Sequence, residues 1–279
     1  MRRARLVLYC FAIAFTLLAQ ETAVLRNDGQ PIRVPFACTS ENLDWAGLAC
    51  ADDDPCSIYL ELNAVAAAGK KIFAAGNLHA QSATLSSILL ASDDGGLTWK
   101  EPAARVRGAA LDQFQFYDAQ HGWASGETVY PLARDPFFLI TSDAGDSWRN
   151  RAVTDEGGPG SIQRFIFDSP EHGELLVDGG RGAEGGRYKR YQSNTGGDSW
   201  SIQSATDTAP KMPSASAADP DYRITAGKAV YRIEKKAAGK WSSIAAFAVN
   251  AASCKSPERK EGAPPPETPP DGAGGKEPQ

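Results

Sequence analysis

The sequence has little positive charge, few histidines and no hydrophobic segment long enough to cross a membrane. Its 279 residues include 29 basic and 34 acidic side chains, a net charge of −5, and only three histidines. An acidic chain is a poor candidate for binding nucleic acid or an anionic membrane surface. The uncharged apolar run Leu6–Leu18 has 13 residues, whereas a membrane-spanning helix needs about 20.

Several signatures of enzymes and metal sites are also missing. There is no Gly-x-Ser-x-Gly elbow, phosphate-binding loop or dinucleotide fingerprint, and the cysteines lack the C-x₂-C pairing of zinc sites. His121 and His172 are 51 residues apart and His79 stands alone, so we expect no metal and no cofactor. The acidic run 52–54 could attract Ca²⁺, but without EF-hand spacing we interpret it as a solvated loop.

The N-terminus has the features of a secretory signal peptide. Arg2, Arg3 and Arg5 precede the apolar run, and Ala19 offers a cleavage point before Gln20. We therefore predict that residues 1–19 are removed and that the protein is exported, to the periplasm or the extracellular space; a retained N-terminal anchor is the alternative. Cleavage removes three basic residues and leaves 26 against 34 acidic, a net charge of −8, and no membrane span.

Four cysteines remain after cleavage, which in an exported chain suggests two disulfides. Cys50 and Cys56 enclose five residues that include Pro55, so a local bond between them closes easily. Cys38 and Cys254 would then pair and tie the two ends of the domain together. Sequence alone leaves this connectivity open, because four cysteines allow three pairings.

A short pattern recurs three times along the chain. It reads Ser-x-Asp-x-Gly-x-Thr-Trp at 92–99, recurs at 141–148, and recurs at 193–200 with Thr195 in place of the aspartate. The tryptophans Trp99, Trp148 and Trp200 are 49 and 52 residues apart. A period of this length indicates a repeat architecture.

Other positions recur with the same period. Gly76, Gly126 and Gly179 each follow a short apolar strand, at spacings of 50 and 53 residues. We interpret the run at 239–241, which ends in Trp241, as the remnant of a fourth unit. Short strands repeated every 45–50 residues predict four-stranded sheets arranged radially.

The predicted organisation is a signal peptide (1–19), one all-β domain (20–254) of about four or five four-stranded blades, and a tail (255–279). Seven of the 25 tail residues are proline and four are glycine, so we expect the tail to be disordered. We expect the protein to be a monomer.

The repeated octapeptides resemble the Asp-box, or BNR repeat. Together with the strand Gly122-Trp123-Ala124-x-Gly126, they resemble the photosynthesis system II assembly factor family, a sialidase-type propeller family. The resemblance covers about residues 60–250 and implies a β-propeller whose boxes are structural turns. The box residues it assigns a structural role are Ser92, Asp94, Gly96, Thr98, Trp99, Thr141, Asp143, Gly145, Ser147, Trp148, Ser193, Gly197, Ser199 and Trp200.

The resemblance implies a non-catalytic scaffold that binds a protein or peptide on one face. The basic cluster Arg181, Arg187, Lys189 and Arg190 could belong to that face, although we favour solvated loop charge. The alternative is a sialidase-like glycoside hydrolase, because Ile32-Arg33-Val34-Pro35 resembles the arginine motif of sialidases. That function would require Arg33 to meet two further arginines at the central axis.

Overall fold

The computed structural model describes residues 23–129, 132–212 and 220–255. The predicted signal peptide (1–19) lies outside these residues, as does all but Lys255 of the predicted tail (255–279). Within them the fold is almost entirely β, as predicted, with one short helix, α1 (Ser40–Trp45). No helix in this part of the chain is long and apolar enough to cross a bilayer.

The strands follow one another with short connections. In chain order they are β1 (Leu25–Arg26), β2 (Cys56–Ala68), β3 (Lys71–His79), β4 (Thr84–Ser92), β5 (Thr98–Trp99), β6 (Ala109–Phe116), β7 (Gly122–Val129), β8 (Ala133–Thr141), β9 (Arg149–Ala152), β10 (Ser161–Phe167), β11 (Gly173–Asp178), β12 (Tyr188–Ser193), β13 (Ser201–Thr206), β14 (Tyr222–Ala226), β15 (Val230–Ala237), β16 (Lys240–Ala248) and β17 (Asn250–Cys254).

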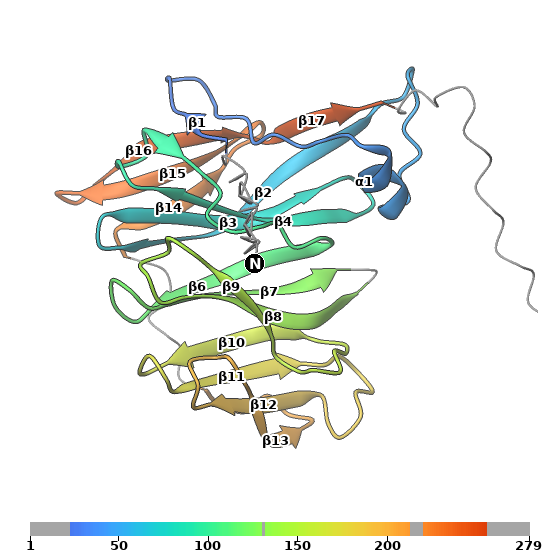
Figure 1. Ribbon diagram of the computed structural model, residues 1–279, viewed down its shortest axis with the longest axis vertical. Helices are drawn as coiled ribbons and strands as arrows, with labels where there is room; N and C mark the ends of the chain where they lie inside the picture. Colours follow the sequence, from blue (N-terminus) through green and yellow to red (C-terminus); the bar gives the residue numbers. More distant parts are fainter. Residues whose placement is uncertain (1–22, 130–131, 213–219, 256–279) are drawn as a thin grey trace, which may run out of the picture.

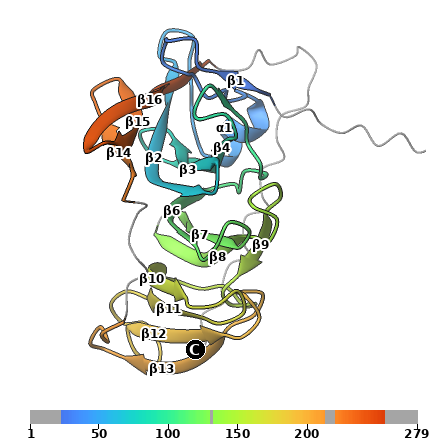
Figure 2. The ribbon, with the colours of Figure 1, turned by 90° about the vertical axis from the view of Figure 1, so that its left-hand side faces the viewer.

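These strands form four larger antiparallel sheets and one small one. The orders are β17-β2-β3-β4, β6-β7-β8-β9, β10-β11-β12-β13 and β14-β15-β16, and β1 pairs with β5. The sheets stack face to face: β14 and β15 contact β2, β2 to β4 contact β6, and β10 contacts β7 and β8. In both ribbon views β10–β13 and β14–β16 therefore lie towards opposite ends of the stack (Figures 1 and 2).

Aromatic and aliphatic side chains fill the spaces between the sheets. Trp123 stacks on Phe167 between the β6–β9 and β10–β13 sheets, with ring centroids 3.7 Å apart. Trp99 meets Phe247 edge to face at 5.3 Å, where the β14–β16 sheet packs on β17-β2-β3-β4. Each fully buried side chain of this size contributes roughly 2–3 kcal/mol, so these aromatic layers hold the sheets together.

The N-terminal segment and the last strand fasten the two ends of the domain. β17 pairs with β2, and Ile32 forms a parallel bridge with Phe247 of β16. Disulfides join Cys38 to Cys254 and Cys50 to Cys56, so the chain contains the two disulfides expected from its four cysteines.

The outer faces of the two end sheets are polar. On the β10–β13 sheet, Arg190 is bonded to Glu174 at 2.6 Å, and on the β14–β16 sheet, Arg223 is bonded to Glu234 at 2.6 Å. Arg223 also lies 4.2 Å from the centroid of the Trp241 ring. Polar outer faces are typical of units that terminate a stack.

The prediction that residues 239–241 are the remnant of a fourth box is wrong. The turn before Trp241 joins β15 to β16, the second and third strands of its sheet, whereas the other boxes follow the third strand. Ala238 and Gly239 both have positive φ, 49° and 77°, which is the geometry of a two-residue type I′ hairpin turn. The glycine and tryptophan therefore reflect an ordinary hairpin.

Candidate functional site

The first box is a turn whose carboxylate is occupied by its own backbone. Asp94 Oδ1 accepts hydrogen bonds from the N–H groups of Leu97 and Thr98, at 3.0 and 2.9 Å, and Oδ2 accepts one from the Thr98 hydroxyl at 2.6 Å. The buried Ser92 hydroxyl donates to Asp94 and accepts from the Gly96 N–H. With its oxygens used in this way, Asp94 stabilises the turn.

The second box repeats this arrangement. Asp143 accepts from the N–H and the hydroxyl of Ser147, and Thr141 takes the place of the serine. The hydroxyl of Ser147 is the main cause of the low pKa of Asp143, about 2. Desolvation would raise the pKa of Asp94, but bonds from Thr98, Ser92 and Leu97 together lower it to about 2. Both carboxylates are therefore ionised at neutral pH.

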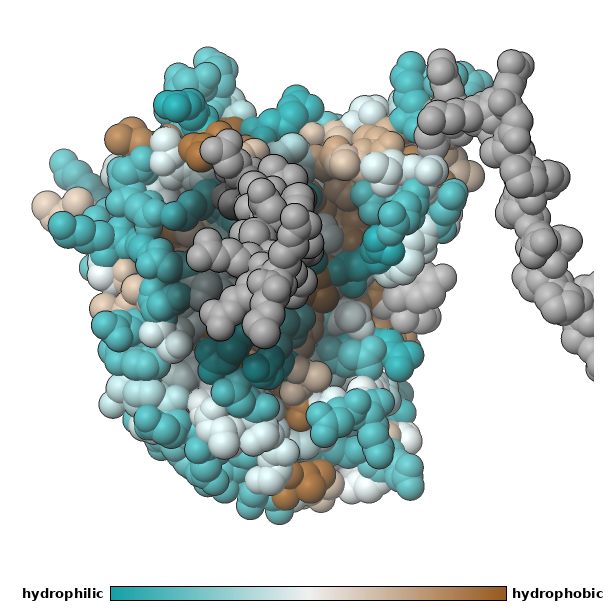
Figure 3. Space-filling view, viewed as in Figure 1, coloured by the Kyte–Doolittle hydropathy of each residue, from teal (hydrophilic) through white to brown (hydrophobic). Residues whose placement is uncertain are grey.

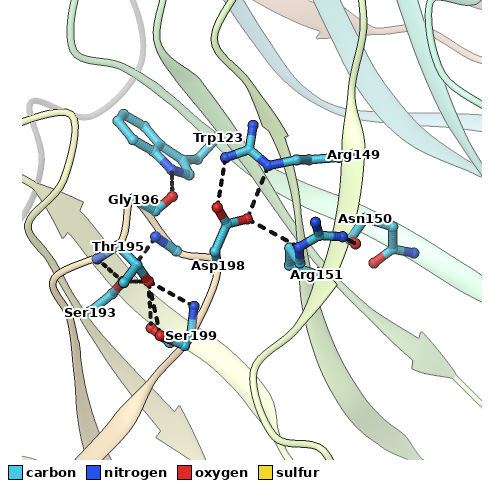
Figure 4. A network of polar contacts seen from close by, with 10 residues as sticks. Trp123, Arg149, Asn150, Arg151, Ser193, Thr195, Gly196, Asp198 and Ser199 are labelled. Carbon is cyan, nitrogen blue, oxygen red and sulfur yellow. Dashed lines mark hydrogen bonds and ion pairs between the residues drawn. The ribbon is translucent and has the colours of Figure 1, made fainter.

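The third box keeps the turn but changes the position of its tryptophan. The Thr195 hydroxyl accepts from the Ser199 N–H at 2.9 Å and so replaces one function of the missing carboxylate. In the first two boxes the indole N–H of the tryptophan donates to the glycine carbonyl three residues earlier. Trp200 makes no such bond and its buried Nε1 has no partner, while Trp123 of the neighbouring sheet donates to Gly196 (Figure 4).

An ion-pair network links the third box to the preceding sheet. Asp198 accepts from Nε of both Arg149 and Arg151 at 3.0 Å, so that strand β9 is fixed against the box (Figure 4). The Arg149 side chain is the main cause of the lowered pKa of Asp198. All three groups are partly exposed, so this network fixes geometry more than it adds stability.

A groove of about 810 Å³ opens beside this network. One wall is the loop between β9 and β10, residues 153–160, and the other is formed by β12 and β13. Trp200, Tyr191 and Ile202 give the groove an apolar floor, and Ile202 is 55% exposed. Asp155, Glu156 and Glu184 place negative charge around it, against the single positive charge of Lys189.

Strand β13 runs along this groove as a sheet edge. It pairs with β12 on one side, and in the described part of the chain no strand pairs with its other side. Most of its residues are exposed. An unpaired edge presents backbone donors and acceptors that can take up an additional strand.

A second polar site lies on the inner strands and was not predicted from the sequence. A β-bulge interrupts the pairing of each of three strands, β2, β6 and β10, with the strand that follows it. The bulges lie at Asn63, Asp112 and Gln163. These positions are 49 and 51 residues apart, the period of the repeat. Bulges re-aim side chains, and here Asn63 donates to Asp112 at 3.2 Å across two sheets.

Carboxylates gather around these bulges. The pKa of Glu127 is raised to about 7. Desolvation is the main cause, and the negative charge of Asp112 raises the pKa further. Desolvation and the charge of Glu61 raise the pKa of Asp112, against a hydrogen bond from Asn63. Carboxyl groups with strongly perturbed pKa values cluster at functional sites, so these residues are the candidates for any chemistry here.

Replacing Glu127 with glutamine is expected to stabilise the protein at alkaline pH. Because the folded-state pKa of Glu127 lies above its unfolded value, the folded state holds an extra proton between pH 4.5 and 7. Stability is therefore lost as the pH rises through this range, by about 3 kcal/mol. Urea unfolding from pH 4 to 8 should show a shallower decline in Glu127→Gln, and an unchanged decline would contradict the assignment.

The residues proposed for sialidase chemistry are not brought together. Arg33 is exposed and lies 3.4 Å from Asn250 Oδ1, beside the bridge between Ile32 and β16. Arg190 and Arg223 are held by Glu174 and Glu234 on separate sheets.

The basic cluster of the sequence is divided between two faces. Arg187 is bonded to Asp178 and Arg190 to Glu174, whereas Lys189 lines the groove on the opposite face. Lys189 and Arg190 are consecutive residues of β12, so side-chain alternation places them on opposite faces of the sheet. The cluster is therefore divided at this point of the strand.

The histidines and the acidic run have ordinary environments. His121 and His172 bond to Asp118 and Asp168 in equivalent turns, and residues 52–54 are exposed in the loop closed by the Cys50–Cys56 bond. Within the described ranges, no group of three or more metal-binding side chains is placed to hold an ion.

Comparison with known proteins gives only distant likenesses. No protein-family model and no curated protein matches the chain. Similar solved structures include YCF48 bound to D1 peptide, with 16% identity, a TM-score of 0.37, and coverage of 70% of this chain and 60% of that one.

Two further structures are similar at this level. YCF48 from Cyanidioschyzon merolae has 14% identity and a TM-score of 0.31, covering 67% of this chain and 49% of that one. An α-L-arabinofuranosidase from Fusarium graminearum, in complex with an iminosugar inhibitor, has 18% identity and a TM-score of 0.33, covering 70% and 62%. The chain thus spans roughly half to three-fifths of the length of these proteins.

Proposed function

We propose that the chain is an exported scaffold of the Asp-box β-propeller type, with about four or five blades, that acts as a monomer. It binds a protein or peptide partner and catalyses no reaction. The observation that carries this proposal is the apolar groove beside the free edge of β13. Two disulfides fit an oxidising compartment such as the periplasm or the extracellular space.

The proposed ligand is an extended peptide segment that adds to β13. Its backbone would pair with the free edge, and an apolar side chain would enter the groove against Ile202 and Trp200. The acidic rim formed by Asp155, Glu156 and Glu184 favours a segment with basic residues.

Peptides selected on the protein from a random library are expected to bind at this groove. Binding should weaken at least about tenfold in Ile202→Lys, because the lysine removes an apolar contact and blocks the floor. Leu97→Lys is the matched control, since Leu97 is also an exposed apolar residue, 63% accessible, but lies in the first box. Calorimetry of both variants with the selected peptides makes the comparison.

Two results would contradict the proposal. Either no peptide is enriched over an unrelated immobilised protein, or the enriched peptides bind Ile202→Lys as tightly as Leu97→Lys. Circular dichroism of the two variants checks that each keeps the native β content. Peptides that bind elsewhere on the protein would thus be recognised.

Glycoside hydrolysis is the competing function, and the inner carboxylates are the feature that favours it. Glu127 and Asp112 are neighbouring carboxyl groups whose pKa values are both raised, with desolvation as the main cause at each. Arg33, the arginine of the sialidase-like motif, donates instead to Asn250 Oδ1 at 3.4 Å. Turnover of a fluorogenic sialoside or arabinofuranoside that disappears in Glu127→Gln would replace the scaffold proposal.

A further inference from the structure

A small pocket lies beneath α1, away from the groove and from the inner carboxylates. It has a volume of about 240 Å³ and is formed by the segment around α1, the start of β4 and the loop between β5 and β6. On the face seen in Figure 3, hydrophobic residues gather towards the upper right, around the part of the fold that holds α1 in Figure 1. Its lining includes Phe36, Asn42, Trp45, Ser86, Arg105 and Arg107.

One wall of the pocket carries a buried hydroxyl without a partner. Ser86 is 8% exposed, and its Oγ makes no hydrogen bond to the protein. The adjacent Ser87, by contrast, accepts from the Val106 N–H at 2.9 Å. A buried hydroxyl left unpaired is unfavourable, so a ligand group that bonds to Ser86 would gain from it.

Two guanidinium groups face the same pocket in fixed positions. Arg105 is held by both oxygens of Glu101, at 2.8 and 2.6 Å, and by the Pro35 carbonyl at 2.9 Å. Arg107 is bonded to Glu41 at 2.6 Å and lies over the Trp45 ring, 5.6 Å from its centroid.

The carboxylate partners of these arginines do not line the pocket. The lining therefore presents two positive charges and no negative one. Each guanidinium has five N–H donors, more than the hydrogen bonds to Glu101, Pro35 and Glu41 occupy. Fixed arginines with remaining donors are suited to bind a carboxylate.

The other walls are apolar and flat. Phe36 and Leu85 lie on one side, and Trp45, 41% exposed, lies on the other. The Trp45 ring packs close to the backbone at Gly108, where a Cβ would lie 2.5 Å from the ring, so a glycine is needed at this position. Pockets for drug-sized ligands begin at about 300 Å³, so this pocket accommodates a group no larger than one aromatic amino acid.

We propose that this pocket binds a carboxylate carried on a flat apolar group. The carboxylate pairs with Arg105 and Arg107 and accepts a hydrogen bond from Ser86, while the ring lies against Trp45. Such a group can be a free aromatic acid or the C-terminal residue of a peptide. The site is separate from the groove and does not depend on the function proposed above.

Titrations of the purified protein with benzoate and benzamide test the charge requirement. Benzoate is expected to bind at least about tenfold more tightly than benzamide. The indole N–H signal of Trp45, assigned with Trp45→Phe, should shift with benzoate in nuclear magnetic resonance spectra. A peptide ending in phenylalanine, with a free or an amidated C-terminus, identifies the source. Binding of the free-terminus peptide indicates a peptide ligand, and binding of benzoate alone indicates a free acid.

Variants separate a specific site from general attraction to positive charge. Arg107→Gln is expected to weaken benzoate binding about tenfold, whereas Arg151→Gln, on another sheet, should not. Ser86→Ala should weaken binding yet raise the thermal midpoint of the free protein by about 2 °C, because it removes an unpaired buried hydroxyl. Equal affinity for benzoate and benzamide, or unchanged benzoate affinity in both Arg107→Gln and Ser86→Ala, overturns the proposal.

Discussion

Replacing Cys38 and Cys254 with serine is expected to lower the free energy of unfolding by about 5 kcal/mol. The bond joins residues 216 positions apart, and the entropy that a cross-link removes from the unfolded chain grows with the length of the loop it closes. The bond also holds the segment around α1 onto β17. Urea unfolding monitored by tryptophan fluorescence, in a buffer that contains neither an oxidant nor a reductant, measures the difference.

The second disulfide is the matched control. Cys50 and Cys56 are only six positions apart, and the same relation gives about 2 kcal/mol for their removal. The double variant Cys50→Ser/Cys56→Ser should therefore retain most of the stability. Equal losses in the two double variants would show that loop length does not determine the effect.

Gly76→Ala is expected to destabilise the protein by at least about 3 kcal/mol or to prevent its accumulation. A Cβ at this position would lie 1.9 Å from the backbone oxygen of Glu61 on the paired strand, and backbone atoms cannot move aside as a flexible side chain can. Gly76 pairs with Leu62, next to the bulge at Asn63. Gly76 is therefore required because the backbone of β2 comes very close to it beside the bulge.

Gly227→Ala provides the comparison. Gly227 has no positive φ, and a Cβ there would lie 3.3 Å from its nearest neighbour, the Val230 carbonyl. Its replacement should change the free energy of unfolding by less than about 1 kcal/mol. Thermal and urea midpoints of both variants make the measurement, and a similar loss in each would refute the steric explanation.

The repeat could be predicted because its turns use local chemistry. Asp94 bonds to residues three and four positions later, so the whole interaction lies within eight residues of sequence. Sheet pairing of consecutive strands is almost as local, and the all-β class followed from it. Sequence could not show that Trp200 lacks the indole hydrogen bond of Trp99 and Trp148, or that Trp123 from another sheet donates to Gly196 of the third box.

The predicted equivalence of Gly179 with Gly126 is wrong. Gly126 pairs with Leu111, next to the bulge at Asp112, and the corresponding partner of Ile162 is Val177. The spacing from Gly126 to Val177 is 51 residues, the same as between His121 and His172. The spacing of Asn63, Asp112 and Gln163 was equally visible, but polar residues in strands carry no signal of a bulge by themselves.

The groove and the small pocket could not be predicted, because each is built from segments distant in sequence. Phe36, Ser86 and Arg107 meet only after the N-terminal segment has packed on β4. Charge pairing has the same limitation for Arg107, because its partner Glu41 is 66 residues away in sequence.

The pairing of β17 with β2 constrains the order in which the protein can fold. The β17-β2-β3-β4 sheet acquires its last strand from residues 250–254, so a ribosome must have made almost the whole chain before the first sheet is complete. Such long-range closure slows folding relative to local pairing. In the newly made chain this sheet therefore lacks its edge strand until residues 250–254 have been added.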